Sequence, residues 1–403
     1  MSVRTRLGAA TTVAIIALTG LIVISELYVS IPLTPTVQRV FDVSQAQASW
    51  VGTAFGLAYG GGVLVFGPLS DRYGRKTIIV PGLLVLAVST FAVGFSPSYE
   101  ILIGLRIVQG LAAATFPAAA VAYIGEVLPE SIRATGIGVV TTGVLAAGIV
   151  GQVYADAVML VAGWEWVFWG LAAVYVVFIA LLYALPQTEG EDRQSEPGLL
   201  TVYARMGRLL QNRVLLSAYF GGFAVLFTFV GMYSGLAPYL QTAFGVSSQQ
   251  LLLVRAAGIP GMLLSPFAGR PIARYGSSRV ASGSFVLAAG GLGLEAIAGS
   301  LPVLVVGSIV FVTGIAAAVP SLISLIGETV PSARGTAVAL YVSILFIGAS
   351  VGPLLPTSLQ SIGFVGLCGL LAVVLLVAAG ILVLSRNGSA PQLADNATPG
   401  DVE

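Results

Sequence analysis

The sequence predicts an all-α integral membrane protein whose twelve transmembrane helices form two pseudo-symmetric six-helix bundles. Three observations support this fold class. The 403 residues are 57% hydrophobic and only 9% charged, with a mean hydropathy of +0.98, whereas about a quarter of the residues of a soluble domain are charged. Apolar windows long enough to cross a bilayer recur along the chain. The second half of the chain also repeats motifs of the first half.

The apolar windows define the individual helices. A hydrocarbon core about 30 Å thick requires about 20 apolar residues per helix. The chain begins with Arg4 and Arg6 before an apolar run, as a secretion signal does, but the run continues to Ile31 without a small-residue cleavage pattern. We therefore interpret it as a retained first span. The twelve predicted spans cover residues 9–31, 47–68, 77–95, 100–125, 135–158, 164–185, 214–238, 250–269, 279–299, 302–326, 336–358 and 363–385.

The basic residues predict the orientation of these spans, because lysine and arginine are enriched in cytoplasmic loops. With a cytoplasmic N-terminus, fifteen of the eighteen basic residues lie on the cytoplasmic side. Only Arg39 lies outside, while Arg106 and Arg255 lie within spans. We therefore expect a multi-pass protein of the cell membrane with both termini in the cytoplasm.

Polar stretches predict the domain boundaries. The expected domains are an N-terminal six-helix bundle (1–187), a cytoplasmic central loop (188–213), a C-terminal six-helix bundle (214–386) and a disordered cytoplasmic tail (387–403). Residues 199–213 of the loop carry apolar residues at helical spacing with arginines between them. This pattern predicts either a short helix on the inner leaflet or a solvated linker.

An internal repeat relates the two halves. An offset of 202 residues aligns residues 72–74 with 274–276 and residues 125–126 with 327–328. With one residue deleted, Arg133 aligns with Arg334. The acid of the first loop has no counterpart in the second, where Ala273 stands. Six helices are therefore expected twice, in the same orientation.

Three short motifs carry a family resemblance. The segment "GPLSDRYGRK" at 67–76 resembles the signature of the major facilitator superfamily between its second and third helices. The segment "RIVQG" at 106–110 is similar to the fourth-helix motif of its drug/proton antiporters, and "GWEWVF" at 163–168 is similar to the start of its sixth helix. The glycine-proline pattern of these antiporters in span five occurs here in span eleven, as "GASVGP" at 348–353. The resemblance covers residues 9–385 and implies a transporter with a site near the bilayer midplane.

The charged motif predicts a gate at the cytoplasmic face. Glycines permit a tight reversal there, and the resemblance implies that Asp71 faces the start of the eleventh helix across the seam between the halves, where the helix dipole stabilises a carboxylate. A topogenic basic turn with an incidental acid is the alternative. Arg75 is expected to pair with Glu126, and by the repeat Arg274 with Glu328. The predicted gate residues are Gly67, Asp71, Arg72, Gly74, Arg75, Lys76, Glu126 and Arg133, and in the repeat Arg274, Gly276, Glu328 and Arg334.

Charges within spans predict the transport site, because placing a charge at a helix centre costs about 2.5 to 3.5 kcal/mol. Glu26 and Arg106 lie at matching depths, about 7 and 9 Å from the outer ends of their spans, and are expected to face one cavity. Competition between a proton and a substrate for Glu26 would couple their movements. Alternatively, Glu26 braces helix packing or reaches the outer interface, and Arg106 reaches that interface. The predicted cavity residues are Glu26, Arg106, Gln109, Tyr28 and Arg255. Further candidates are Gln152, Tyr233 and Tyr341, whereas Asp156 and Glu295 are expected to be interfacial.

The predicted function is proton-coupled efflux of small organic molecules such as drugs, sugars or metabolites, by alternating access. The alternative is uptake or facilitated diffusion on the same fold without proton antiport. We expect the partners to be a small-molecule substrate, protons and the lipid bilayer, and the functional unit to be a monomer. No basic stripe indicates a nucleic-acid partner. The chain has no histidine and a single cysteine, Cys368, which argues against disulfides and against metal sites built from histidine and cysteine. We expect no cofactor, with the proton as the coupling ion. No P-loop is present, and no carboxylate pair shares a helix face within a span, which argues against an enzyme.

Overall fold

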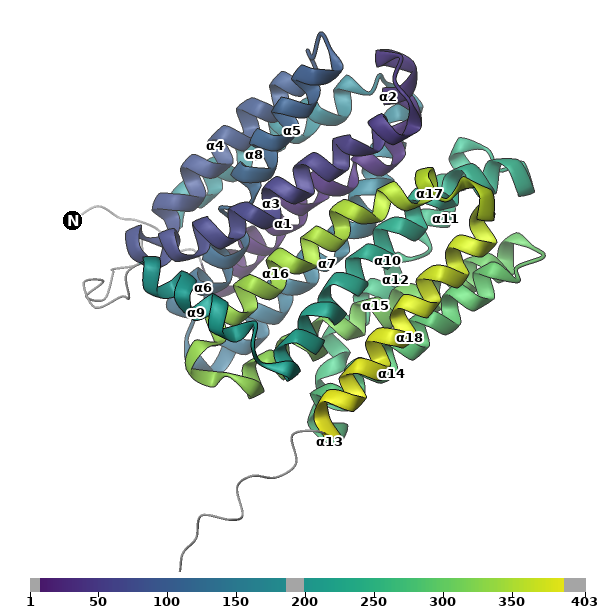
Figure 1. Ribbon diagram of the computed structural model, residues 1–403. Coiled ribbons are helices and arrows are strands. Elements are labelled where there is room, and N and C mark those ends of the chain that lie inside the picture. Colours follow the sequence, from purple (N-terminus) through teal and green to yellow (C-terminus); the bar gives the residue numbers. More distant parts are fainter. Residues whose placement is uncertain (1–7, 186–198, 388–403) are drawn as a thin grey trace, which may run out of the picture.

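The computed structural model describes residues 8–185 and 199–387, which form helices and the turns between them and include no strand. The predicted all-α class is therefore confirmed for this part of the chain. In Figure 1 the purple and blue helices of the first half lie beside the green and yellow helices of the second half. The predictions for the N-terminal arginines, for most of the central loop and for the tail fall outside the described residues.

The first half consists of helices that follow one another through short turns. They are α1 (Ala9–Tyr28), α2 (Ser30–Phe41), α3 (Gln45–Tyr73), α4 (Arg75–Val93), α5 (Tyr99–Ala113), α6 (Pro117–Val127), α7 (Glu130–Val161) and α8 (Glu165–Ala184).

The second half begins after the helix α9 (Leu199–Leu209), which bears out the helical interpretation of that stretch. Its helices are α10 (Arg213–Phe244), α11 (Ser248–Ala256), α12 (Ile259–Leu263), η2 (Ser265–Ala268), α13 (Gly269–Tyr275), α14 (Ser277–Ala296), α15 (Leu301–Thr329), η3 (Pro331–Ala333), α16 (Arg334–Val351), η4 (Gly352–Leu354), α17 (Leu355–Ser358), η5 (Gln360–Ile362) and α18 (Gly363–Asn387).

Nine helical segments within the described residues are long and apolar enough to cross a membrane. Three of the twelve predicted spans differ from them. Span four is divided into α5 and α6 by a turn before Pro117, and span eight is divided into α11, α12 and η2 around Gly258 and Pro260. Proline lacks the backbone donor that a continuous helix requires. Span nine, α14, is unbroken but carries serines, glycines and Glu295. The count of twelve crossings remains a prediction.

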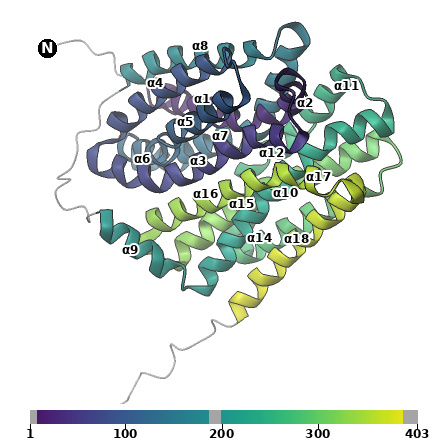
Figure 2. The ribbon, with the colours of Figure 1, turned by 45° about the horizontal axis from the view of Figure 1, so that its top comes forward.

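The loops alternate between two ends of the molecule. We call the end that carries residues 71–76 the motif end and the opposite end, which carries Gly245, the distal end. At the distal end, the Tyr99 hydroxyl donates to the backbone oxygen of Gln47 at 2.7 Å, joining the starts of α5 and α3. Figure 2 shows α9 at the motif end, next to the second half. If the predicted orientation holds, the motif end is cytoplasmic.

The two halves pack mainly through α3 with α16, α7 with α11 and α12, and α2 with α10. Between α3 and α16, the Thr53 hydroxyl donates to the backbone oxygen of Ser350 at 2.7 Å. A side chain at Gly56 would collide with Ser350, so this helix pair requires a small residue there.

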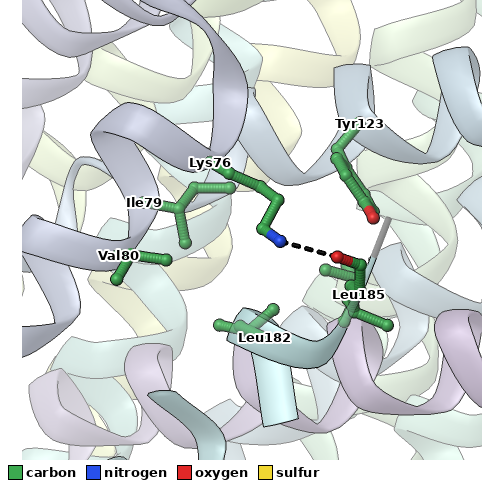
Figure 3. A pocket seen from close by; sticks show the side chains of 7 residues that line it. Lys76, Ile79, Val80, Tyr123, Leu182 and Leu185 are labelled. Carbon is green, nitrogen blue, oxygen red and sulfur yellow. Dashed lines mark hydrogen bonds between the residues drawn. The ribbon is translucent and has the colours of Figure 1, made fainter. Parts of the chain in front are cut away.

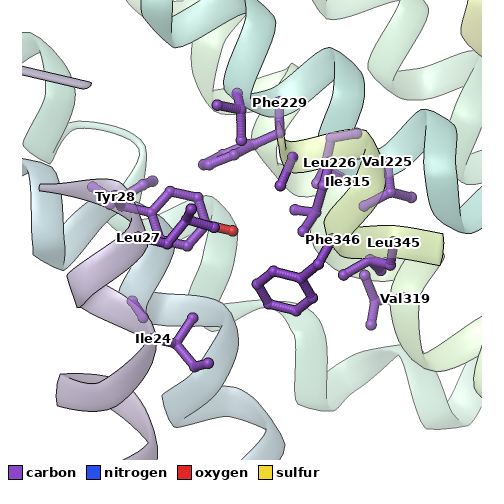
Figure 4. Close-up of a cluster of buried hydrophobic side chains, with 14 of the residues drawn as sticks. Ile24, Leu27, Tyr28, Val225, Leu226, Phe229, Ile315, Val319, Leu345 and Phe346 are labelled. Carbon is purple, nitrogen blue, oxygen red and sulfur yellow. The ribbon is translucent and has the colours of Figure 1, made fainter. Parts of the chain in front are cut away.

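The middle of the seam between the halves is apolar and aromatic. Figure 4 shows side chains of α1 facing those of α10, α15 and α16. The ring of Tyr28 meets the ring of Phe229 edge-on at 5.9 Å, and Tyr59 lies 4.1 Å from Phe346 between ring centroids. Contacts across the middle of the seam are therefore dispersion and ring contacts. Each such contact is individually weak, so the halves can replace one set of contacts by another when they move.

The glycines of α7 serve packing inside the first half. A Cβ at Gly143 would lie 2.7 Å from the backbone oxygen of Ala17, and one at Gly151 would lie 2.8 Å from that of Ser25. The span-five glycines therefore bring α7 close to α1, as small residues do in membrane helix pairs.

Candidate functional site

A buried ion pair lies inside the first half, between α1 and α5. The side chains of Glu26 and Arg106 are both fully buried, and Nη1 of Arg106 lies 3.3 Å from Oε1 of Glu26. The structure thus brings together the two charges that the sequence placed at matching depths. Because both side chains are buried, each charge requires the other: a single buried charge without an opposite charge beside it would strongly destabilise the fold.

Further side chains complete the hydrogen bonding of the Glu26 carboxylate. Gln109 donates to Oε1 at 2.8 Å through its Nε2 atom, which also lies 2.8 Å from the Thr90 hydroxyl. The Tyr175 hydroxyl of α8 donates to Oε2 at 2.9 Å. Glu26 therefore accepts from α5 and α8, and Gln109 connects it to α4. We call Glu26, Thr90, Arg106, Gln109 and Tyr175 the first-half cluster.

Arg106 also holds backbone oxygens of two neighbouring helices. Its Nε donates to the oxygen of Val51 in α3 at 3.0 Å, and its Nη2 donates to the oxygen of Glu26 at 2.8 Å. The guanidinium lies 4.6 Å from the centre of the Phe55 ring and 5.9 Å from that of Phe168. These contacts use the planar guanidinium in a way that a lysine cannot reproduce.

The first-half cluster does not face the seam between the halves. All of its members and its described hydrogen-bond partners belong to residues 8–185. Among the predicted cavity residues of the first half, the one that reaches the seam is Tyr28, two positions after Glu26 on the same helix. The sequence predicted a cavity-lining Glu26 and Arg106, whereas the structure places them one layer behind the seam, because successive residues of a helix point in different directions.

A second buried ion pair joins the two halves at the distal end. Nη1 of Arg255 in α11 lies 2.6 Å from Oδ2 of Asp156 in α7, and the side chains are 1% and 9% exposed. Asp156 and Arg255 were expected at an outer interface and in a cavity, respectively. The structure instead makes them a clasp between the halves, and the Nε atom of Arg255 has no partner in the described chain.

The charged motif makes its contacts within the first half. Arg75 forms ion pairs with Asp71 and with Glu126, the latter at 2.9 Å, and donates to Ser70 at 3.1 Å. The predicted Arg75–Glu126 pair is therefore present. Asp71 is exposed, and among the described residues its recorded partner is Arg75 rather than the start of α16. The short i to i+4 spacing across Gly74 favours this local pairing over a contact across the seam.

Lys76 fixes the end of α8 to the start of α4. Its Nζ donates to the backbone oxygen of Leu185 at 2.7 Å and to that of Tyr183 at 3.3 Å. A lysine at the last carbonyls of a helix also interacts favourably with the helix dipole. Figure 3 shows this lysine at the edge of a shallow pocket whose lining residues all belong to the first half. We assign this contact to holding the first half together.

The second-half motif keeps the geometry of the first but changes the partners. Gly74 and Gly276 both have positive φ angles, 102° and 85°, which glycine adopts without strain. The prediction that Arg274 pairs with Glu328 is wrong for the described structure: Ser277 donates to Glu328 at 2.6 Å, and Ser324 does so at 2.9 Å. The offset of 202 places Ser277, not Arg274, at the position of Arg75.

The remaining motif and cavity candidates have local contacts. Arg72 and Arg274 each lie near the ring of the following tyrosine, at 5.8 and 5.2 Å. Arg133 donates to the backbone oxygen of Leu128 at 3.4 Å, and Gln152 donates to that of Gly148 at 2.7 Å. Tyr341 is buried with a hydroxyl that has no described partner.

Sequence reasoning missed three residues. Tyr175 and Thr90 belong to the network of the buried Glu26, and Ser277 donates to the exposed Glu328. A tyrosine or threonine in an apolar span carries no charge to mark it, and only the packing of α8 and α4 shows which way it points. The repeat was the one available signal: adding the offset of 202 to residue 75, the arginine that pairs with Glu126, gives Ser277.

Two packed halves of long apolar helices, with one ion pair buried inside a half and another between the halves, indicate a multi-pass membrane protein. The family model described as Major Facilitator Superfamily matches residues 16–353 and 220–400. The chain belongs to the major facilitator superfamily, whose members are transporters.

Several bacterial transporters are similar to the chain over most of its length. The Bacillus subtilis protein named "Uncharacterized MFS-type transporter YceJ" is 28% identical over 332 residues, 80% of this chain and 82% of that protein. "Uncharacterized MFS-type transporter YybF" of the same species is 27% identical over 373 residues, 89% of this chain and 90% of that protein. An "Uncharacterized transporter" of Buchnera aphidicola is 27% identical over 338 residues, 81% of this chain and 79% of that protein. These relatives agree on transport and name no substrate.

Proposed function

We propose that this transporter exports small organic molecules in exchange for protons, and that Glu26 is the carboxyl that binds the proton. The observation that carries the proposal is the first-half cluster. It holds a fully buried carboxylate against one guanidinium, one amide and one hydroxyl. Intramembrane acids of this kind are commonly proton sites.

Binding of a proton to Glu26 would change the contacts of α1. The neutral acid no longer needs the Arg106 cation, and its protonated oxygen no longer accepts a hydrogen bond in the same way from Gln109 or Tyr175. Arg106 retains its bonds to the backbone oxygens of Val51 and Glu26. The proton therefore alters how tightly α1 is held to α5 and α8 without removing the guanidinium.

Helix α1 connects this site to the seam. Tyr28 lies two residues after Glu26 and contacts Phe229 of the other half. A shift of α1 on protonation would change the seam surface formed by Tyr28 and its neighbours (Figure 4). Because that surface is apolar and aromatic, we assign it to binding the apolar part of a substrate. The proton and the substrate then influence each other through one helix, as coupling requires.

Alternating access follows from the contacts between the halves. The Asp156–Arg255 pair and the α3–α16 packing hold them together toward the distal end and the middle. Opening of the transporter at the distal end would require the Asp156–Arg255 pair to separate. The proposed cycle alternates between states with and without this clasp.

The proposal is tested with purified protein in vesicles that carry an imposed pH gradient. Ethidium and radiolabelled sugars serve as first probes, and their accumulation is measured with and without the gradient. We expect gradient-driven transport in the unchanged protein and its loss in Glu26→Gln, while exchange of substrate without a gradient continues. Glu100→Gln, an exposed acid on α5, is the matched control and should transport normally.

Two results would contradict the proposal. Transport that ignores the gradient in the unchanged protein would favour the uptake or facilitated-diffusion alternative. Gradient-driven transport of normal size in Glu26→Gln would remove Glu26 from the coupling.

A further inference from the structure

A second acid, Glu295, is buried in the second half and is not used by the proposed cycle. It lies in the last turn of α14, and its side chain is fully buried. Its Oε1 atom has no hydrogen-bond partner in the described chain. The ion pairs of the described residues involve other acids. A buried carboxylate without a cation is strongly unfavourable, and such a group becomes neutral by binding a proton.

Uncharged polar groups from three helices lie near Glu295. The Cys368 thiol of α18 lies 3.9 Å from Oε2, and Ser308 of α15 lies near the carboxyl, next to Gly307, which packs against the Glu295 side chain. Tyr233 of α10 follows, with its hydroxyl 3.5 Å from that of Ser308. Arg255, beyond Tyr233, is already paired with Asp156. Hydrogen bonds are thus available to a neutral acid, but an ionised one has no charge compensation.

Close helix packing leaves little room for a metal ion or a water cluster at this acid. A Cβ at Gly307 would lie 3.0 Å from the Cγ of Glu295, and one at Gly291 would collide with the backbone of Phe311. Helices α14 and α15 therefore touch where the carboxyl lies. A proton is the cation that such a site can accept without expansion.

The internal repeat places this site opposite the first-half cluster. Helices α10, α14, α15 and α18 occupy the same order in the second half as α1, α4, α5 and α8 in the first. The offset of 202 residues aligns Arg106 with Ser308, so the second half has a hydroxyl where the first has a guanidinium. Each half therefore buries an acid among these four helices, Glu26 on α1 and Glu295 on α14, and of these two acids only Glu26 has a cation.

We propose that Glu295 is a second proton-binding site, which holds its proton at neutral pH. The proton leaves by transfer to Ser308 as Ser308 passes its own hydroxyl proton to Tyr233 and Tyr233 releases its hydroxyl proton to water, which leaves Glu295 ionised and both hydroxyls neutral. The Tyr233 hydroxyl lies next to Gly258, at the turn after Arg255, where a Cβ would come within 2.7 Å of it. Separation of the Asp156–Arg255 clasp would expose this turn to water. The site goes beyond the role proposed for Glu26 and does not depend on it.

Infrared spectroscopy of the purified full-length protein tests the site without a substrate. A protonated carboxylic acid has a carbonyl stretch that is distinct from the bands of carboxylates and shifts in heavy water. We expect this band at neutral pH in the unchanged protein, its loss in Glu295→Gln and its retention in Glu26→Gln and in the exposed control Glu100→Gln. Two results in Glu295→Gln would overturn the proposal. One is a protonated-acid band of unchanged size, and the other is the loss of a carboxylate band instead of the protonated-acid band.

Two further variants keep the acid and protect the test against misfolding. Cys368→Ala and Ser308→Ala each remove a polar neighbour and should move the frequency of the Glu295 band without removing it. Frequencies unchanged in both would contradict the assignment to Glu295. Because no transport is measured, a failure of the coupling proposed for Glu26 leaves these results unaffected.

Discussion

The two halves of the transporter bury their acids in different ways. In the first half Glu26 is held by Arg106, Gln109 and Tyr175, whereas in the second half Glu295 has a thiol and a hydroxyl beside it. The two sites lie among corresponding helices of the repeat, but the acids come from helices that do not correspond, α1 for Glu26 and α14 for Glu295. The difference therefore lies in which positions carry the polar side chains. It indicates that a duplicated bundle can keep its packing while its charge compensation diverges.

The largest expected effect comes from removing the cation of the first half. Arg106→Ala leaves Glu26 buried without a charge partner and deprives the backbone oxygens of Val51 and Glu26 of donors. Loss of one partner of a buried pair costs about 3 to 5 kcal/mol, which we expect to see as a large fall in thermal stability in detergent. In the second half, Ser308→Ala at the aligned position should have a much smaller effect. Equal effects of the two changes would contradict the difference drawn between the sites.

The acids themselves provide the next comparison. Glu26→Gln leaves the Arg106 cation buried and unpaired, so we expect it to destabilise the protein by a similar amount, about 3 to 5 kcal/mol. Glu295→Gln replaces a neutral acid by a neutral amide, so we expect a change within about 1 kcal/mol. Denaturation of both variants in one detergent measures the difference. A strongly destabilising Glu295→Gln would indicate that Glu295 is ionised and has a cation partner.

At the clasp between the halves, the effect is expected mainly on conformation. Asp156→Asn removes the charge that pairs with Arg255 and should shift the protein toward states that are open at the distal end. Spin labels placed at the distal ends of α7 and α11 can report the change as a longer distance distribution. The exposed change Asp71→Asn should leave that distribution unaltered. An unaltered distribution in Asp156→Asn would show that apolar packing alone holds the distal end closed.

The smallest expected effect tests what the two halves share. Gly74→Ala and Gly276→Ala each place a side chain on a residue with positive φ, which costs about 1 kcal/mol or more. Because both turns have the same backbone geometry, we expect similar losses of thermal stability in the two variants. A loss in only one of them would show that the duplicated turns have diverged as the acids have.

The sequence predicted the helical class, the family and the meeting of Glu26 with Arg106, because apolar length, motif spacing and depth along a helix are local properties. It did not predict the breaks near Pro117 and Gly258 within spans four and eight, since hydropathy windows average over them. It also did not predict the partners of Asp71 and Glu328, because these depend on which residue of the next helix follows the turn in the right orientation. The burial of Glu295 depended on its packing against Gly307, which no single span reveals.

The central claim is that Glu26 binds the proton that is exchanged for substrate. Substrate-induced proton release measures this directly: a transported compound is added to purified protein in weak buffer, at a pH low enough for Glu26 to hold its proton, and the pH is followed. The account predicts release from the unchanged protein and from Glu295→Gln, and none from Glu26→Gln. Equal release from the unchanged protein and Glu26→Gln would contradict it.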